Sequence, residues 1–316
     1  MHVAELNGAD PMSAPIPDVL AGLAEHGVVR FRGVDTSASA FAEVTHRFSS
    51  RFTCDPFKVG PAGLVTAPGR LGQVARVASR AGAFAASKLG IEADDDGTRT
   101  APREGYGLNP HNENTFIPAA CPEMVWFACD TPASDGGSTL LCDGRDLWAA
   151  LTPEAQALAT SEPVRYELTF SRRQWQAVYD TTSAEAVMER LHTVKGTTAQ
   201  MDDAGTLRYV FDVDQVGRDH FADAPVLSTN VLSRRPLGQV GDAEVERLAS
   251  GDPLPSWFVG ELLAAVDEHH LAVDLQAGDM ILIDNTRVMH GRAAFTDLSR
   301  KVLTRCAWFD PEKLAA

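Results

Sequence analysis

The chain has 316 residues, 44% of them hydrophobic and 22% charged, a composition that is typical of a globular protein and excludes a disordered or fibrous one. Its 28 basic and 43 acidic residues give a net charge of -15, which excludes the broad positive surface that nucleic acid requires. No stretch reaches the roughly 18 consecutive apolar residues of a membrane-spanning helix, so we expect neither nucleic acid nor a membrane as a partner.

The chain start and the cysteines indicate the compartment. The N-terminal residues MHVAELNGAD contain neither the basic region nor the apolar run of a signal peptide. The cysteines are odd in number, scattered and without a CxxC pair, which is typical of reduced thiols; they are Cys54, Cys121, Cys129, Cys142 and Cys306. We therefore expect a cytoplasmic protein.

Helix and strand patterns precede the first motif. Residues 18–27 have helical apolar spacing and lead into the strand-like run VVRFRG, in which apolar residues alternate with arginines. Helical spacing returns at residues 40–48. Residues 64–105 are rich in glycine, alanine and charge and end in the turn-prone run DDDGTRTAPREG. This segment is expected to be a lid or a solvated loop.

Sheet patterns dominate the remaining parts of the chain, with helix between them. The runs MVWFACD and STLLCDG flank a Gly-rich turn and predict two strands. Residues 145–225 contain helical stretches around the strand-like run VRYELTF, and we expect a helical insertion there. Strand patterns surround a helix predicted at residues 255–269. Because the length suits one elaborated domain, we predict a single domain over residues 1–316, mainly β with peripheral helices (α+β).

The segment GLNPHNENTF contains a candidate metal pair, His111 and Glu113. On a helix these two positions would project about 200° apart, whereas on a strand both point to the same side. His-x-Glu therefore predicts a strand-borne pair of metal ligands. His290, which follows the strand-like run GDMILIDN, is the best candidate for a third ligand. Two histidines and one carboxylate leave coordination positions open on iron for oxygen and a bidentate co-substrate.

The motifs HNENTF, DGGST, GD-x(4)-DN and HGR-x(2)-F together resemble the TauD/TfdA family of Fe(II)/2-oxoglutarate dioxygenases. The resemblance is nearest to the His-x-Glu branch, which includes clavaminate-synthase-like and syringomycin-type hydroxylases. It extends over residues 28–309, with its specific motifs at 106–142 and 276–309. It implies a double-stranded β-helix, or jelly roll, with helices outside and iron between two sheets. The implied cofactors are Fe(II), the co-substrate 2-oxoglutarate and O2.

The resemblance also implies roles for individual residues. His111, Glu113 and His290 match the iron ligands of the family, and Thr139 in GGST matches the threonine that bonds a carboxylate of 2-oxoglutarate. A carboxylate ligand such as Glu113 indicates hydroxylation, because halogenases of this fold have Gly or Ala at that position.

The arginine that anchors 2-oxoglutarate is where the chain departs from the family pattern. The family has two arginines four residues apart on the last strand, and that register falls here on Lys301 and Arg305. Strand alternation places Lys301, Leu303 and Arg305 on one face and Arg300 on the other. We expect Arg305 to be the main anchor with Lys301 beside it and Arg300 to be a solvated edge charge. There are two alternatives: Lys301 replaces the first of the two family arginines, or a bulge turns Arg300 inward.

The expected reaction is hydroxylation of an unactivated C–H bond in a small amino-acid-like or carboxylate substrate, with release of succinate and CO2, in secondary metabolism. The same centre serves desaturation, cyclisation and epoxidation, which stay open as alternatives. More remote alternatives are a metal-dependent hydrolase and a non-catalytic binding barrel. A hydrolase would have no need for a carboxylate anchor made of Thr139, Lys301 and Arg305.

Overall fold

The structure is a computed structural model that describes residues 1–7, 10–53, 99–100, 105–233, 235, 237–238 and 246–314. Of the segment 64–105, predicted to be a lid or a solvated loop, residues 99, 100 and 105 are described and the rest lies outside the described residues. Within the described ranges, no helix combines the length and the apolar character that crossing a bilayer would require.

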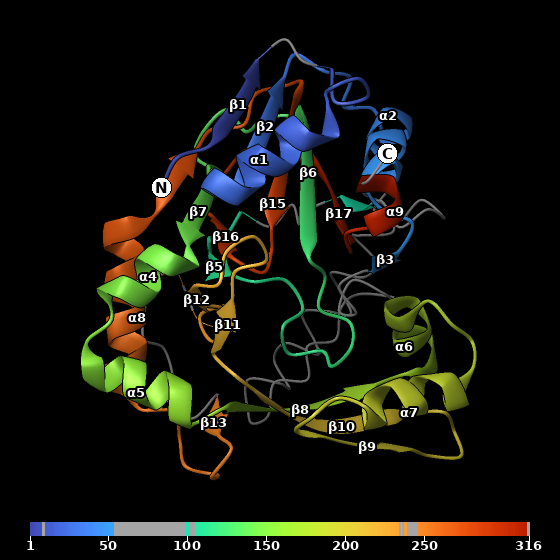
Figure 1. Cartoon of the computed structure of the whole chain (residues 1–316), viewed down its shortest axis with the longest axis vertical. Helices are drawn as coiled ribbons and strands as arrows, with labels where there is room; N and C mark the ends of the chain where they lie inside the picture. The colour runs from blue at the N-terminus through green and yellow to red at the C-terminus, as the bar shows by residue number, and fades with distance from the viewer. Residues whose placement is uncertain are drawn as a thin grey trace.

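A seven-stranded sheet forms the first layer (Figure 1). Its order is β1-β2-β15-β6-β17-β3, and β4 also pairs with β17. The β1–β2 pair is parallel and the other pairs are antiparallel. The strands are β1 (Ala4–Asn7), β2 (Val28–Arg32), β15 (Asp279–Asp284), β6 (Met124–Thr131), β17 (Lys301–Ala307), β3 (Phe52–Thr53) and β4 (Arg99–Thr100).

A four-stranded antiparallel sheet packs against the first one. Its order is β14-β7-β16-β5, and its strands are β14 (Leu271–Val273), β7 (Thr139–Asp143), β16 (Val288–Arg292) and β5 (Leu108–His111). One buried apolar cluster, which we call the inter-sheet core, contains side chains of both sheets. Its members include Val125 and Ile283 from the large sheet and Leu141 and Val288 from the small one. The two sheets therefore face each other across this core.

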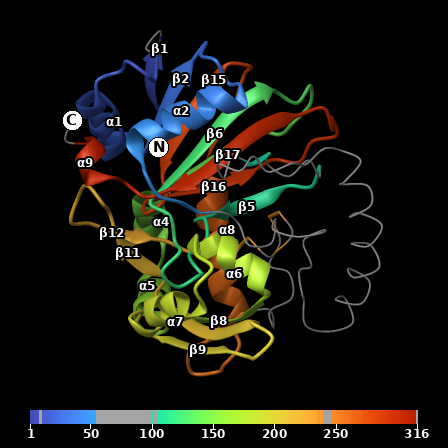
Figure 2. The ribbon, with the colours of Figure 1, turned by 90° about the vertical axis from the view of Figure 1, so that its right-hand side faces the viewer.

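Helices cover the outer face of the large sheet. Leu282 and Leu303, which alternate with inward-facing neighbours, pack with Leu23 and Phe41 in a second cluster. The covering helices are α1 (Ile16–His26) and α2 (Ala38–Phe48), and the short α9 (Pro311–Leu314) adjoins α2. Figure 2 shows α1 and α2 on one side of this sheet. Both faces of β15 and β17 are consequently buried, as the apolar run MILI of β15 allows.

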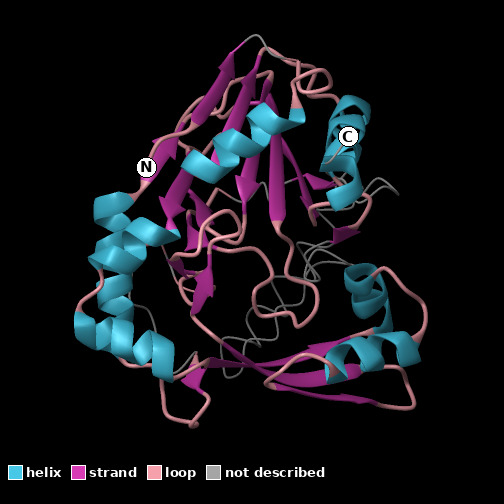
Figure 3. Cartoon of the chain, viewed as in Figure 1, coloured by secondary structure: helices cyan, strands magenta, loops and turns pink. Residues whose placement is uncertain are grey.

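A third group of helices covers the outer face of the small sheet. Cys142 and Met289 point to this side and pack with Leu147 and Phe258. The helices are α4 (Gly144–Ala150), α5 (Pro153–Ser161) and α8 (Ser256–His269). The fold is thus a mixed α/β arrangement of several sheets with helices outside them, as Figure 3 shows.

The segment 145–225, predicted as a helical insertion, is a mixture of helices and strands. It includes α6 (Arg172–Tyr179) and α7 (Ala184–His192), but also β8 (Val164–Phe170), β9 (Thr197–Met201) and β10 (Leu207–Val213). These three strands and β13 (Arg247–Leu248) form a separate sheet, and β11 (Val216–Arg218) pairs with β12 (Pro225–Leu227). The prediction missed β9 because its side chains are partly or fully exposed and give no apolar signal.

Gly291 determines how closely β5 approaches β16. The β5–β16 register is irregular between His290 and Arg292, and Gly291 lies at that point. A Cβ on Gly291 would lie 2.5 Å from the Leu108 carbonyl oxygen and 2.7 Å from the Pro110 nitrogen. These are backbone atoms, so only a residue without a Cβ permits this approach.

Gly291→Ala is expected to lower the free energy of unfolding by about 1–3 kcal/mol, because β5 must move away from β16 to admit the methyl group. Gly260→Ala is the matched control. A Cβ on Gly260, inside α8, would meet no atom within 4 Å, and alanine there should be neutral or stabilise by roughly 0.5–1 kcal/mol. Urea unfolding followed by circular dichroism measures both, and equal stability of the two variants would contradict this account.

Candidate metal centre

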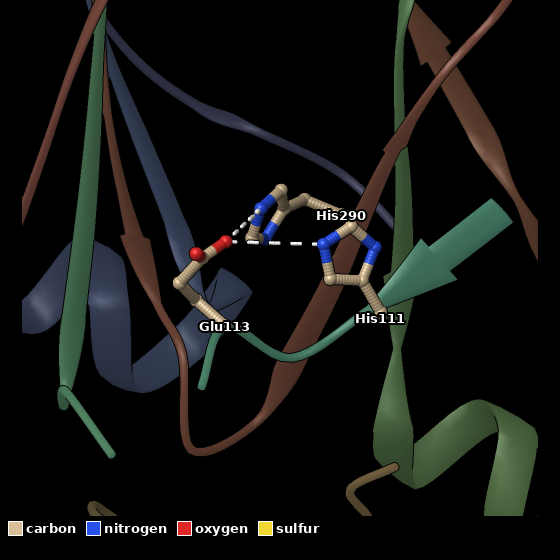
Figure 4. A group of neighbouring side chains, drawn as sticks. All are labelled: His111, Glu113 and His290. Atoms are coloured by element: carbon tan, nitrogen blue, oxygen red, sulfur yellow. Dashed lines mark ion pairs between the residues drawn. The ribbon is translucent and has the colours of Figure 1, made fainter. Parts of the chain in front are cut away.

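The pairing of β5 with β16 brings the two predicted histidines together. His111 ends β5 and is the Cα partner of His290 on β16, and their ring centroids lie 4.9 Å apart. Glu113 lies two residues beyond His111 and turns its carboxylate toward both rings (Figure 4). Glu113 Oε2 is 3.8 Å from His111 Nε2 and 3.5 Å from His290 Nε2. The three candidate ligand atoms all lie within 4.8 Å of one another.

The cluster lies at the edge of the inter-sheet core. His290 shares the inward face of β16 with Val288, and its ring is 5.3 Å from the ring of Phe127 on β6. The His290 side chain is 7% exposed, whereas those of His111 and Glu113 are 15% exposed. The centre is therefore mostly enclosed but keeps an accessible side.

The hydrogen bonding of His111 suits a metal ligand. Its Nδ1 lies 2.9 Å from the Asn109 carbonyl oxygen, and because a carbonyl only accepts, Nδ1 must donate. The neutral ring then carries its lone pair on Nε2, the atom that faces Glu113. Two imidazole nitrogens and one carboxylate oxygen are the donor set of non-haem iron sites, so these residues fit Fe(II).

Thr139 lies beside this cluster, as the predicted role requires. On β7, Thr139 and Leu141 share one face, and Leu141 belongs to the inter-sheet core. The Cα partners of Thr139 and Leu141 on β16 are Arg292 and His290. The pair Thr139–Arg292 therefore neighbours the pair Leu141–His290 on the inward side of the small sheet.

The structure does not bring Arg305 and Lys301 to the metal cluster, contrary to our expectation. The Arg305 guanidinium lies beneath α2, where it donates to the Ala42 carbonyl at 3.2 Å and stacks 3.9 Å from the Phe52 ring centroid. The Lys301 side chain is 43% exposed and pairs with Asp130 at 3.4 Å. Both residues share the outward face of β17 with Leu303, which packs against the helix layer.

Arg300 is buried rather than a solvated edge charge. It is 6% exposed, and its guanidinium lies 5.4 Å from the Phe295 ring centroid, which Arg292 also approaches at 4.9 Å. Burial, and then the charge of Arg292, lower the pKa of Arg300 to about 10, so it stays cationic at neutral pH. Within the described part of the chain, no carboxylate lies close enough to Arg300 to raise its pKa. Two buried cations next to Thr139 form a candidate anion site.

The buried asparagines around the cluster were not predicted. Asn112, between the two ligands His111 and Glu113, is fully buried and accepts from the Thr229 N–H at 3.0 Å. Asn109 is 1% exposed, and its amide donates to the Leu232 carbonyl at 3.1 Å. The available signal was the run of asparagines in GLNPHNENTF, since polar residues inside a strand pattern need buried partners.

Comparison with known proteins agrees with this geometry. The family model "Taurine catabolism dioxygenase TauD, TfdA family" matches residues 2–307. No curated protein sequence matches the chain.

Solved structures share the fold at low identity. PvcB from Pseudomonas aeruginosa has 15% identity and a TM-score of 0.55, covering 98% of this chain and 87% of its own. A putative alpha-ketoglutarate-dependent taurine dioxygenase from Burkholderia xenovorans has 13% identity and a TM-score of 0.54, covering 98% and 89%. AAD-2, solved with Mn(II) and N-oxalylglycine, has 14% identity and a TM-score of 0.53, covering 96% and 92%. The match over nearly the whole chain shows that it belongs to the TauD/TfdA family of Fe(II)- and 2-oxoglutarate-dependent dioxygenases.

Proposed function

We propose that this dioxygenase hydroxylates an unactivated C–H bond of a small organic molecule. One oxygen atom of O2 enters the new hydroxyl group, and the other enters the succinate formed when 2-oxoglutarate loses CO2. The observation that supports hydroxylation is Glu113, whose carboxylate completes the ligand cluster with the two histidines. Desaturation, cyclisation and epoxidation would use the same residues and remain alternatives.

His111 Nε2, Glu113 Oε2 and His290 Nε2 would hold Fe(II). Iron supplies the redox chemistry when bound, and the protein holds the reactants and limits the access of water. The burial of His290 against Phe127 supports this role, because an aromatic wall offers water no hydrogen-bonding partner there. The two facing sheets around the site support the double-stranded β-helix as the fold, with the metal between them.

Of the two carboxylates of 2-oxoglutarate, Arg300 together with Arg292 and Thr139 would bind the one that does not chelate the metal. Guanidinium groups match a carboxylate with two parallel hydrogen bonds, and the Thr139 hydroxyl adds a donor. The buried pair of arginines also argues against a hydrolase, which would have no use for an anion site beside its metal. A non-catalytic barrel is disfavoured because all three ligands are present and converge.

The substrate is proposed to be a small molecule. An amino-acid-like or carboxylate substrate would be favoured by a second basic residue of β17 near the metal. Arg305 and Lys301 face away from the cluster and do not supply it. We also propose a place in secondary metabolism and a cytoplasmic location; the free thiols of Cys121, Cys129 and Cys142 suit a reducing compartment.

Anaerobic titration with Fe(II) and 2-oxoglutarate should give the visible charge-transfer band of a chelated iron centre. His111→Ala or His290→Ala should abolish the band, because each removes one of three protein ligands. His192→Ala, at the exposed end of α7, is the matched control and should retain it. Absence of the band in the parent protein, or its persistence in both ligand variants, would refute the assignment.

Arg300→Leu should raise the dissociation constant of 2-oxoglutarate by roughly 10- to 100-fold, because a hydrogen bond between charged groups is lost. Lys301→Ala, one residue away on the exposed face, should leave it unchanged. Both constants come from the same anaerobic titration, with folding checked by circular dichroism. A larger increase of the dissociation constant in Lys301→Ala than in Arg300→Leu would identify Lys301 as the anchor instead.

A further inference from the structure

The side chain of Asn285 holds the backbone of the proposed carboxylate ligand Glu113 on both its N–H and its carbonyl group. Glu113 lies outside β5, which ends at His111. The Glu113 N–H donates to Asn285 Oδ1 at 2.8 Å, and Asn285 Nδ2 donates to the Glu113 carbonyl at 3.1 Å. The Asn285 amide thus makes the two bonds that a neighbouring strand would otherwise make with Glu113.

Asn285 is itself fixed from several directions. It is 1% exposed and lies in the turn between β15 and β16, five residues before His290. Its Nδ2 also donates to the Pro122 carbonyl at 2.8 Å, and its N–H donates to the Glu123 carbonyl at 2.8 Å. Asn285 therefore connects the β15–β16 turn, which leads to His290, with both ends of the loop that begins at Glu113.

Asn112 locks this arrangement from the opposite side. Its Nδ2 donates to the Asn285 carbonyl at 2.7 Å, and its own carbonyl accepts from Asn230 Nδ2 at 2.7 Å. The residue between the two ligands His111 and Glu113 thus holds the main chain of Asn285, while the side chain of Asn285 holds Glu113.

From this reciprocal contact we infer that Asn285 is a positioning residue for the metal: it fixes the Glu113 carboxylate relative to the two histidines. The inference rests on the proposed ligand set. Asn285 holds the backbone of Glu113 and so fixes the point from which the Glu113 side chain extends toward the two histidines. Groups that orient ligands in this way typically contribute 10- to 100-fold to metal affinity.

The chemistry of the side chain explains why asparagine is required. Its amide presents one acceptor and two donors in a plane, and here all three are used by Glu113 N–H, Glu113 C=O and Pro122 C=O. Alanine offers none of these groups, and serine keeps a single hydroxyl. Metal affinity should therefore fall in the order asparagine, serine, alanine.

The test is Mn(II) binding to the full chain by isothermal titration calorimetry, with the melting temperature measured with and without Mn(II). Asn285→Ala should raise the Mn(II) dissociation constant by roughly 10- to 100-fold and shrink the metal-induced rise in melting temperature. Asn285→Ser should lie between the parent and Asn285→Ala, and it serves as the readout if Asn285→Ala does not fold.

Asn109→Ala is the matched control for a merely structural role. Asn109 is also 1% exposed, and within the described residues its amide donates to the Leu232 and Arg235 carbonyls and accepts from the Gly238 N–H. The Asn109→Ala variant keeps the backbone carbonyl that accepts the hydrogen bond from His111 Nδ1. We expect a comparable loss of melting temperature without Mn(II), but a much smaller change in Mn(II) affinity.

The outcomes separate the inference from the proposed function. If the parent binds Mn(II) and Asn285→Ala binds it as tightly, or no more weakly than Asn109→Ala does, Asn285 is only structural and the inference fails. If the parent binds no Mn(II), the ligand assignment fails and the inference fails with it.

Discussion

The cross-strand contact between β5 and β16 is the constraint on which the rest of the site depends. It places His111 opposite His290, and the lack of a Cβ on Gly291 permits the close approach of the two strands. The other side of β16 pairs with β7, which adds Thr139 opposite Arg292 on the same face. One central strand thus supplies a candidate metal ligand, a cation and the register for the remaining groups, while its far face carries packing residues such as Met289.

The candidate ligands were found in the sequence through short motifs, but the strand argument for them was only partly right. His111 ends β5, whereas Glu113 lies beyond that strand in a turn. The run GDMILIDN before His290 forms β15 of the large sheet, while His290 itself lies on β16 beside β5 in the small sheet. The anion site was not predictable from alternation alone. Residues of β17 from Val302 to Ala307 are buried on both faces, so the period separates Arg300 from Arg305 but does not say which of them turns toward the inter-sheet core. Only the packing of Leu303 under the helices decides it.

The same limit applies to the fold. Strands with continuous apolar runs, such as β6 and β15, were evident, and so were the helices that cover them. The strand-like run VRYELTF was recognised and is β8, but its sheet with β9, β10 and β13 was not predicted; the side chains of β9 are partly or fully exposed and give no apolar signal. The buried asparagines were missed for a related reason: their partners are main-chain groups more than 100 residues away, which no short motif encodes.

The burial of Arg300 explains why arginine suits this position better than lysine. Its pKa falls to about 10 in this environment, yet the side chain remains charged throughout the physiological range. A lysine starts near 10.4, and a comparable decrease would bring it to about 8, close enough to neutral pH for part of its charge to be lost. If Arg300 binds the co-substrate as proposed, its constant charge makes that binding insensitive to pH within the physiological range.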